Sequence, residues 1–275
     1  MSYDMPIAVE ADFRVLYEDE GVLVVDKAAP LLTHPTGEKN EPTLWHGVRE
    51  LLAYELATGG QVSFINRLDR ETSGITLIAK NAEAASELGK AMQERLLHKE
   101  YYAVVQGVPH WQRAVNAEPI LRMEEVAPTR IHVRQCCHPL GKPCRTEFLR
   151  LEQGSDVSCP CCLVRCFPHT GRMHQIRVHL AHLGYPIVGD KIYGGDESCY
   201  LDFMEQGWTA ALAARLYLPR HALHACRLSF PRHGELVTVE SPLPPDMRSL
   251  LGTAAHDSNF TGSTEPISPL SSAPV

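Results

Sequence analysis

Short strand-like runs dominate this sequence, and helical segments separate them at irregular intervals. Phe13–Tyr17 and Val22–Lys27 flank the acidic turn Glu18–Gly21 and read as a hairpin. Further strand-like runs are Ile75–Ala79, Tyr101–Val105, Thr129–Val133, Leu163–Phe167, Cys226–Phe230 and Leu236–Glu240. Because strands and helices show no regular βαβ alternation, the pattern favours an α+β fold with a mixed, largely antiparallel sheet and flanking helices.

Two segments in the first 100 residues carry the apolar spacing of amphipathic helices. The first begins at Pro42 and ends near Leu56, ahead of two glycines. The second begins after Asn81, a residue type that caps helix N-termini, and ends near His98. Its expected buried face consists of Ala85, Leu88, Met92 and Leu96.

A third helix is expected over Gly171–Leu183, where apolar residues recur at helical spacing. The expected buried face consists of Met173, Ile176, Leu180 and Leu183, and the other faces carry Arg172, His174, Arg177 and His182. Gly184 and the following Tyr185-Pro186 end the helix.

Length and composition indicate a globular protein. With 275 residues and 44% hydrophobic content, the chain can bury a sizeable core, which we expect to be one domain over residues 1–251. Residues 252–275 are rich in Ser, Thr, Pro and Gly and read as a flexible tail. The sequence shows no membrane span and no signal peptide, and its nine cysteines read as reduced thiols, so we expect a cytoplasmic protein.

Charge is distributed unevenly along the chain. The formal net charge is -7, yet residues 157–189 contain no Asp or Glu and carry Arg165, Arg172 and Arg177 together with four histidines. A locally basic surface on an acidic protein suits a site that binds an anion at one face. Chance clustering on a solvated helix is the alternative.

The sharpest local motif is Asn66–Gly74, with the sequence Asn-Arg-Leu-Asp-Arg-Glu-Thr-Ser-Gly, directly before a strand-like run. Asp69 lies at its centre. One interpretation is structural, because a loop aspartate commonly accepts hydrogen bonds from nearby amides and pairs with arginines such as Arg67 or Arg70.

The same segment resembles the Arg-Leu-Asp-x-x-Thr-Ser-Gly signature of RluA-type pseudouridine synthases. Three further blocks resemble the same family in order and spacing, so that the resemblance covers roughly residues 13 to 250. These blocks are Lys99–Ala103, Thr170–Leu180, and Gly184–Asp190 with the following Tyr193-Gly194.

The resemblance implies isomerisation of uridine to pseudouridine in structured RNA, with no metal or organic cofactor and with Asp69 as the catalytic carboxylate. It further implies that Tyr101 stacks on the target base and that Arg177 pairs with Asp69, which keeps the carboxylate ionised. A core aromatic residue and a surface phosphate contact are the structural alternatives for Tyr101 and Arg177.

By the same resemblance, Arg67, Arg172 and His174 are expected to contact RNA. The chain begins almost directly with core strands, so we expect a stand-alone catalytic domain, monomeric, that acts on transfer RNA first and ribosomal RNA second. Asn66 departs from the family pattern, which usually has histidine there, and we expect this change to affect a loop hydrogen bond or RNA preference.

Two alternatives from other classes stay open. Cys159, Cys161 and Cys162 contain one C-x-x-C spacing, which is typical of zinc sites in a non-catalytic RNA-binding or zinc-binding module, although Cys162 and Cys166 also alternate like one face of a strand. A glycoside-type hydrolase would use Asp69 with a second carboxylate, for which Glu71 and Asp190 are the candidates.

Overall fold

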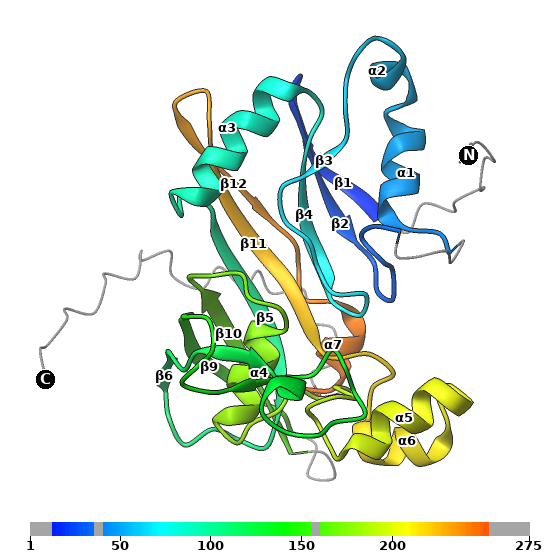
Figure 1. Cartoon of the computed structure of the whole chain (residues 1–275), viewed down its shortest axis with the longest axis vertical. Helices are drawn as coiled ribbons and strands as arrows, with labels where there is room; N and C mark the ends of the chain where they lie inside the picture. Colours follow the sequence, from blue (N-terminus) through cyan, green and yellow to red (C-terminus); the bar gives the residue numbers. More distant parts are fainter. Residues whose placement is uncertain (1–12, 36–40, 156–159, 253–275) are drawn as a thin grey trace, which may run out of the picture.

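The computed structural model describes residues 13–35, 41–155 and 160–252, which form a ten-stranded sheet, a separate two-stranded sheet and several helices (Figure 1). The strands are β1 Phe13–Glu18, β2 Val22–Lys27, β3 Ser63–Phe64, β4 Ser73–Ala79, β5 His98–Gln106, β6 Arg113–Asn116, β7 Ile120–Arg122, β8 Gln135–Cys137, β9 Thr146–Gln153, β10 Cys161–Pro168, β11 Leu223–Arg232 and β12 Glu235–Glu240. The helices are α1 Leu44–Leu51, α2 Ala53–Ala57, α3 Ala82–Gln93, η1 Met123–Glu125, α4 Gln175–His182, α5 Glu197–Gln206, α6 Ala210–Leu216 and α7 Pro245–Ser249.

The large sheet has the strand order β1-β2-β4-β11-β5-β10-β9-β6, with β12 beside β11 and β3 beside β4. Of its pairs, β4 with β11 is parallel and the others are antiparallel. This topology confirms the mixed, largely antiparallel sheet with flanking helices that the sequence predicts.

The apolar strands at the centre are covered on both faces, and the alternation of side chains along β2 shows how. Leu23 and Val25 pack in a cluster with Leu44 and Val48 of α1. The intervening Val22 and Val24 belong to the larger core, which includes Leu88 of α3. Because both faces are buried, β4 and most of β10 read as continuous apolar runs.

Two expected helices differ from the structure. The segment from Pro42 to Leu56 is divided at Leu52 into α1 and α2. In α3 the Asn81 side chain accepts a hydrogen bond from the Ala84 amide as expected, but the helix ends at Gln93. The buried residues of α3 are Ala84, Leu88 and Ala91, and Ala85 is partly buried against the same core, so the expected face was wrong at Met92 and Leu96, which are exposed.

Two further expectations were wrong. The third helix begins at Gln175 rather than Gly171, which leaves Met173 outside it and 43% exposed. Thr129–Val133 is not a strand, because Thr129 accepts a hydrogen bond from the Ile131 amide and holds a turn ahead of β8.

Some expectations fall outside the described residues. These are the N-terminal dozen residues, Cys159 of the C-x-x-C spacing and the tail from residue 253 onward. Within the described ranges, none of the helices combines the length and the apolar character needed to cross a membrane.

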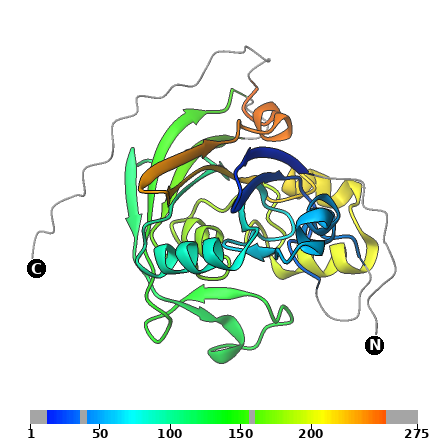
Figure 2. The same cartoon turned by 90° about the horizontal axis from the view of Figure 1, so that it is seen from above.

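The two-stranded sheet of β7 and β8 stands out from the large sheet (Figure 2, green, below). Its base is fixed to the rest of the fold, because β8 contacts α4 and the Gln135 amide donates a hydrogen bond to the Tyr193 hydroxyl oxygen. Below we call residues 120–137 the β7–β8 arm.

Candidate active site

The loop that carries Asp69 is anchored to strand β4 by Asn66. The Asn66 amide donates to the carbonyl oxygen of Ile75 at 3.1 Å, and its side-chain oxygen accepts from the Leu77 amide at 2.7 Å. Asn66 is buried, so the departure from the family's usual histidine fills a structural position in the loop.

The end of the loop requires glycine at position 74, where β4 runs parallel to β11. Gly74 has a φ of +109°, and a Cβ there would lie 2.3 Å from the carbonyl oxygen of Ala225. Only a residue without a side chain permits this approach of two strands. The glycine of the motif is therefore explained by packing.

Asp69 and Arg177 come together from segments 108 residues apart. Arg177 NH1 donates to Asp69 Oδ2 at 2.9 Å, while its Nε and NH2 donate to the two oxygens of Asp190 at 2.7 and 2.9 Å. The side chain of Arg177 is 6% exposed and that of Asp190 is fully buried. The alternative of a surface phosphate contact for Arg177 is excluded by this burial.

These contacts determine the charge of each group. Burial alone would raise the pKa of Asp69, but the charge and the hydrogen bond of the Arg177 guanidinium hold it below its ordinary value. Burial lowers and Asp190 raises the pKa of Arg177, with a net increase. Asp69 is therefore an ionised carboxylate at neutral pH, and its side chain is 33% exposed.

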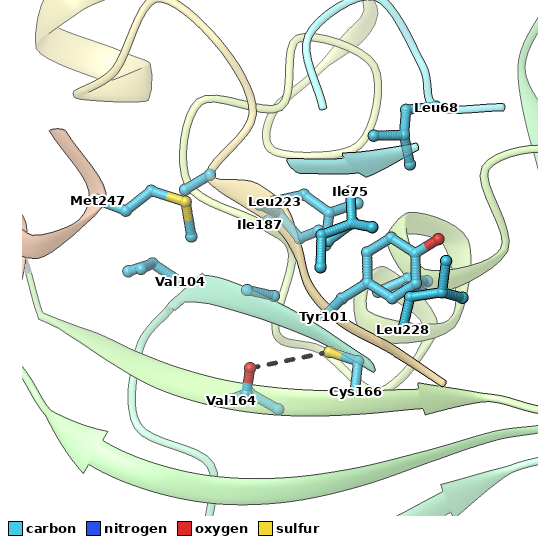
Figure 3. Packing of buried hydrophobic residues seen from close by; sticks show 14 of the residues in the cluster. Leu68, Ile75, Tyr101, Val104, Val164, Cys166, Ile187, Leu223, Leu228 and Met247 are labelled. Atoms are coloured by element: carbon cyan, nitrogen blue, oxygen red, sulfur yellow. Dashed lines mark hydrogen bonds between the residues drawn. The ribbon is translucent and has the colours of Figure 1, made fainter. Parts of the chain in front are cut away.

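Tyr101 lies on β5 and is 9% exposed. Figure 3 shows its ring among Ile75 and Leu228, with the hydroxyl group directed away from Cys166. Burial and the charge of Asp69 raise the pKa of Tyr101, so its hydroxyl stays protonated. The Tyr101 side chain is therefore part of the hydrophobic core, as in the structural alternative, and it also lies close enough to Asp69 for that charge to affect its pKa.

The three residues expected to contact RNA lie around Asp69 or at the surface. His174 has a left-handed backbone (φ 56°) just before α4, and its Nε2 is 3.8 Å from Asp69 Oδ2. Arg172 is exposed, and its Nε donates to the Pro143 carbonyl at 3.3 Å. Arg67 is exposed and makes no hydrogen bond or ion pair within the described ranges.

Two residues to which sequence reasoning assigned no role at the site, Asp190 and Tyr193, hold the site residues in place. Asp190 was considered only as a second carboxylate, and Tyr193 only as part of a motif. The Asp190 side chain also accepts from the amides of Ile192 and Tyr193 at 3.0 and 3.1 Å. A charged residue directly after the apolar run Ile187–Gly189 was the available signal, because a charge in buried surroundings needs a partner.

A second ion pair supports the loop from its other side. Lys191 Nζ donates to Glu71 Oε1 at 2.6 Å, and Glu71 Oε2 accepts from the His221 amide at 3.2 Å. Thr72 Oγ1 and His221 Nε2 are hydrogen-bonded at 2.7 Å. Both carboxylates proposed for a hydrolase, Glu71 and Asp190, are thus committed to ion pairs.

No cysteine site for zinc is formed within the described ranges. Cys162 and Cys166 are free thiols buried on β10, and Cys161 is buried on the same strand. The group of three potential ligands found in those ranges is Asp19, Glu20 and His233, and both oxygens of Asp19 already accept from Arg232 at 2.8 and 3.1 Å.

Comparison with known proteins identifies the family. Residues 21–182 match the RNA pseudouridylate synthase family. The chain belongs to this family. It is 37% identical over 244 residues to the ribosomal large subunit pseudouridine synthase D of Nitrosomonas europaea, covering 86% of this chain and 64% of that protein. The protein of the same name from Haemophilus ducreyi is 33% identical over 248 residues, covering 89% of this chain and 71% of that protein.

Solved structures agree with this membership. Human RNA pseudouridylate synthase domain containing 1 has a TM-score of 0.65 and 28% identity, covering 86% of each chain. Human RNA pseudouridylate synthase domain containing 4 has a TM-score of 0.65 and 25% identity, covering 86% of this chain and 91% of that one. The resemblance to the RluA-type family and the expected fold are both confirmed.

Proposed function

We propose that this protein isomerises uridine to pseudouridine in ribosomal RNA, with Asp69 as the catalytic carboxylate. The observation that carries the proposal is the asymmetric environment of that carboxylate. Arg177 NH1 and His174 Nε2 both face Oδ2, at 2.9 and 3.8 Å, whereas Oδ1 has no hydrogen bond or ion pair within the described ranges. One oxygen is held and the other is available to a substrate.

The reaction breaks the N-glycosidic bond of uridine, turns the uracil, and joins the ring to the sugar through carbon. The ionised Asp69 can attack the sugar carbon, add to the base, or remove a sugar proton, and each of these steps needs the charged form. The ion pair with Arg177, which is itself fixed by Asp190, maintains that form without protonation at neutral pH. The net reaction is an isomerisation and consumes no metal-bound or organic co-reactant.

The other residues have supporting roles in this proposal. The ring of Tyr101 stacks on a uracil removed from the RNA helix, next to Asp69. The exposed Arg67, on the same loop as Asp69, helps to displace the nucleotide. Arg172 and His174 precede α4 and contact the RNA beside it. The domain over residues 1–251 contains all of these groups.

A ribosomal substrate is supported by the names of the two relatives described above, which both specify the large ribosomal subunit. The preference for transfer RNA that we expected from the sequence has no such support. Mapping pseudouridine in total RNA with and without the gene identifies the substrate. Loss of a site in transfer RNA alone would contradict the ribosomal assignment.

The catalytic assignment is tested with Asp69→Asn, which keeps the size of the side chain and removes its charge. We expect tritium release from carbon-5-labelled uridine RNA to fall to background. RNA affinity, measured by filter binding, should change by no more than ~1.4 kcal/mol because phosphate contacts are spread over the surface.

Asp202→Asn is the matched control, because Asp202 lies on α5, is partly exposed and makes no hydrogen bond or ion pair within the described ranges. It should retain wild-type activity. Near wild-type tritium release by Asp69→Asn would overturn the catalytic assignment, and release of free uracil by the wild type would favour a hydrolase.

A further inference from the structure

Tyr193 contacts both groups that face Asp69 Oδ2. Its hydroxyl oxygen lies 2.9 Å from His174 Nδ1, and the guanidinium carbon of Arg177 lies 5.1 Å from the centre of its ring. The ring of His174 also packs edge-on against the ring of Tyr193, with centroids 5.7 Å apart.

Tyr193 itself is held in place by backbone contacts. Its amide donates to Asp190 Oδ1 at 3.1 Å, and the next residue, Gly194, donates its amide to the Asp190 carbonyl at 2.8 Å. Its hydroxyl oxygen accepts a hydrogen bond from the Gln135 amide, at the base of the β7–β8 arm, at 2.9 Å. The position of the phenol oxygen is therefore determined by two separate segments of the chain.

The hydrogen-bond directions follow from these contacts. Because the Tyr193 oxygen already accepts from Gln135, its own O–H is free to donate to His174 Nδ1. A neutral His174 then carries its proton on Nε2, the nitrogen that faces Asp69 Oδ2. The opposite tautomer would turn the lone pair of Nε2 toward an anionic carboxylate, which is unfavourable.

We propose that Tyr193 is a positioning residue that holds His174 as the neutral Nε2–H tautomer, with this N–H directed at Asp69 and the substrate bound there. This proposal rests on the proposed function of Asp69. The distance of 3.8 Å from Nε2 to Oδ2 is too long for a hydrogen bond. The Nε2–H group is thus an unused donor, available to a uracil or ribose oxygen next to the carboxylate.

The charge state of His174 agrees with this geometry. The charged and titratable groups around it are Asp69, Arg177, Asp190, Tyr193 and His221. Burial and the neighbouring Arg177 lower the pKa of His174 to about 4, so the imidazole is neutral under ordinary assay conditions.

The direct test is the tautomer of His174, read from the nitrogen chemical shifts of the full-length protein labelled with ¹⁵N-histidine. His174→Gln identifies the resonances by their loss. We expect the wild-type protein to show the Nε2–H form. The Nδ1–H form, or a charged ring at pH 7, would overturn the proposal without reference to any activity.

The second test is Tyr193→Phe, which keeps the ring over Arg177 and removes the hydroxyl group. We expect a mixture of the two His174 tautomers, a fall in kcat of about tenfold, and RNA affinity within about twofold of wild type, since one directed hydrogen bond is lost. Tyr54→Phe is the control, because Tyr54 is 80% exposed on α2, far from α4 (Figure 1). It should match the wild type.

An unchanged tautomer and kcat in Tyr193→Phe would refute the positioning role. If Tyr193→Phe fails to fold, the wild-type spectrum still decides the tautomer. Failure of the proposed function is recognised separately, by tritium release from Asp69→Asn, whereas the nitrogen spectrum does not depend on turnover.

Discussion

Removing the carboxylate from the buried pair of Arg177 and Asp190 should destabilise the protein more than removing it from a pair of the same geometry whose carboxylate is partly exposed, and the chain contains such a pair. Arg220 donates Nε and NH2 to the two oxygens of Asp246 at 2.7 and 2.9 Å, the same distances as in the Arg177–Asp190 pair. The side chain of Asp190 is fully buried, whereas that of Asp246 is 41% exposed.

The two pairs differ in the hydrogen bonds and charge partners that remain after the carboxylate is removed. Asp190→Ala leaves the buried Arg177 with Asp69 as its remaining carboxylate and removes the acceptor of two backbone amides. We expect a loss of about 3–5 kcal/mol in the free energy of unfolding. Asp246→Ala leaves a site that water reaches, and Arg220 keeps bonds to backbone carbonyls, so we expect a loss of about 1 kcal/mol.

Urea unfolding of the wild type and both variants measures these losses, and equal slopes establish that the same transition is compared. The reasoning requires Asp190→Ala to cost at least about 2 kcal/mol more than Asp246→Ala. Equal losses would show that burial does not determine the strength of the Asp190 pair. A compact Asp190→Ala protein should also release tritium slowly, because Arg177 is free to turn away from Asp69.

Two further predictions concern positions outside the reacting groups. Gly74→Ala should destabilise the fold by about 3 kcal/mol or more, since its Cβ would meet the Ala225 backbone. Gly89→Ala, in the middle of α3 where no atom lies near the added Cβ, should stabilise the fold by up to about 1 kcal/mol. Similar urea midpoints for the two variants would contradict the close approach of β4 and β11. Burial lowers the pKa of Lys27 from 10.5 to about 7, so the unfolded chain binds more protons between these values and stability rises with pH there. Between pH 7 and pH 9 the wild type should gain on the order of 2 kcal/mol relative to Lys27→Met, and parallel pH profiles would refute the shift.

The sequence predicted best those elements whose signals are local. The hairpin of β1 and β2 follows from apolar runs around an acidic turn, and the start of α3 follows from the Asn81 cap. The pairing of Asp69 with Arg177 came from the family resemblance, because neither spacing nor charge indicates that residues 108 positions apart meet.

One cause of the wrong predictions is that packing partners decide between patterns that the sequence supports equally. In α3 both Met92 and Ala91 lie at helical spacing from Leu88, and packing against the core buries Ala91 and leaves Met92 exposed. Asp190 and Tyr193 escaped assignment because their roles depend on α4 and on the base of the β7–β8 arm.

Residues 157–189, which contain no Asp or Glu, do not form the exposed basic surface that their formal charge suggested. Arg177 is buried between Asp69 and Asp190, and Arg165 pairs with Glu100, so among their three arginines Arg172 is the one that is exposed without an ion pair. The number of arginines in a sequence therefore overstates how many cationic side chains are exposed and free to bind phosphate. What the segment mainly supplies is a fixed cation that keeps Asp69 ionised in a largely apolar setting.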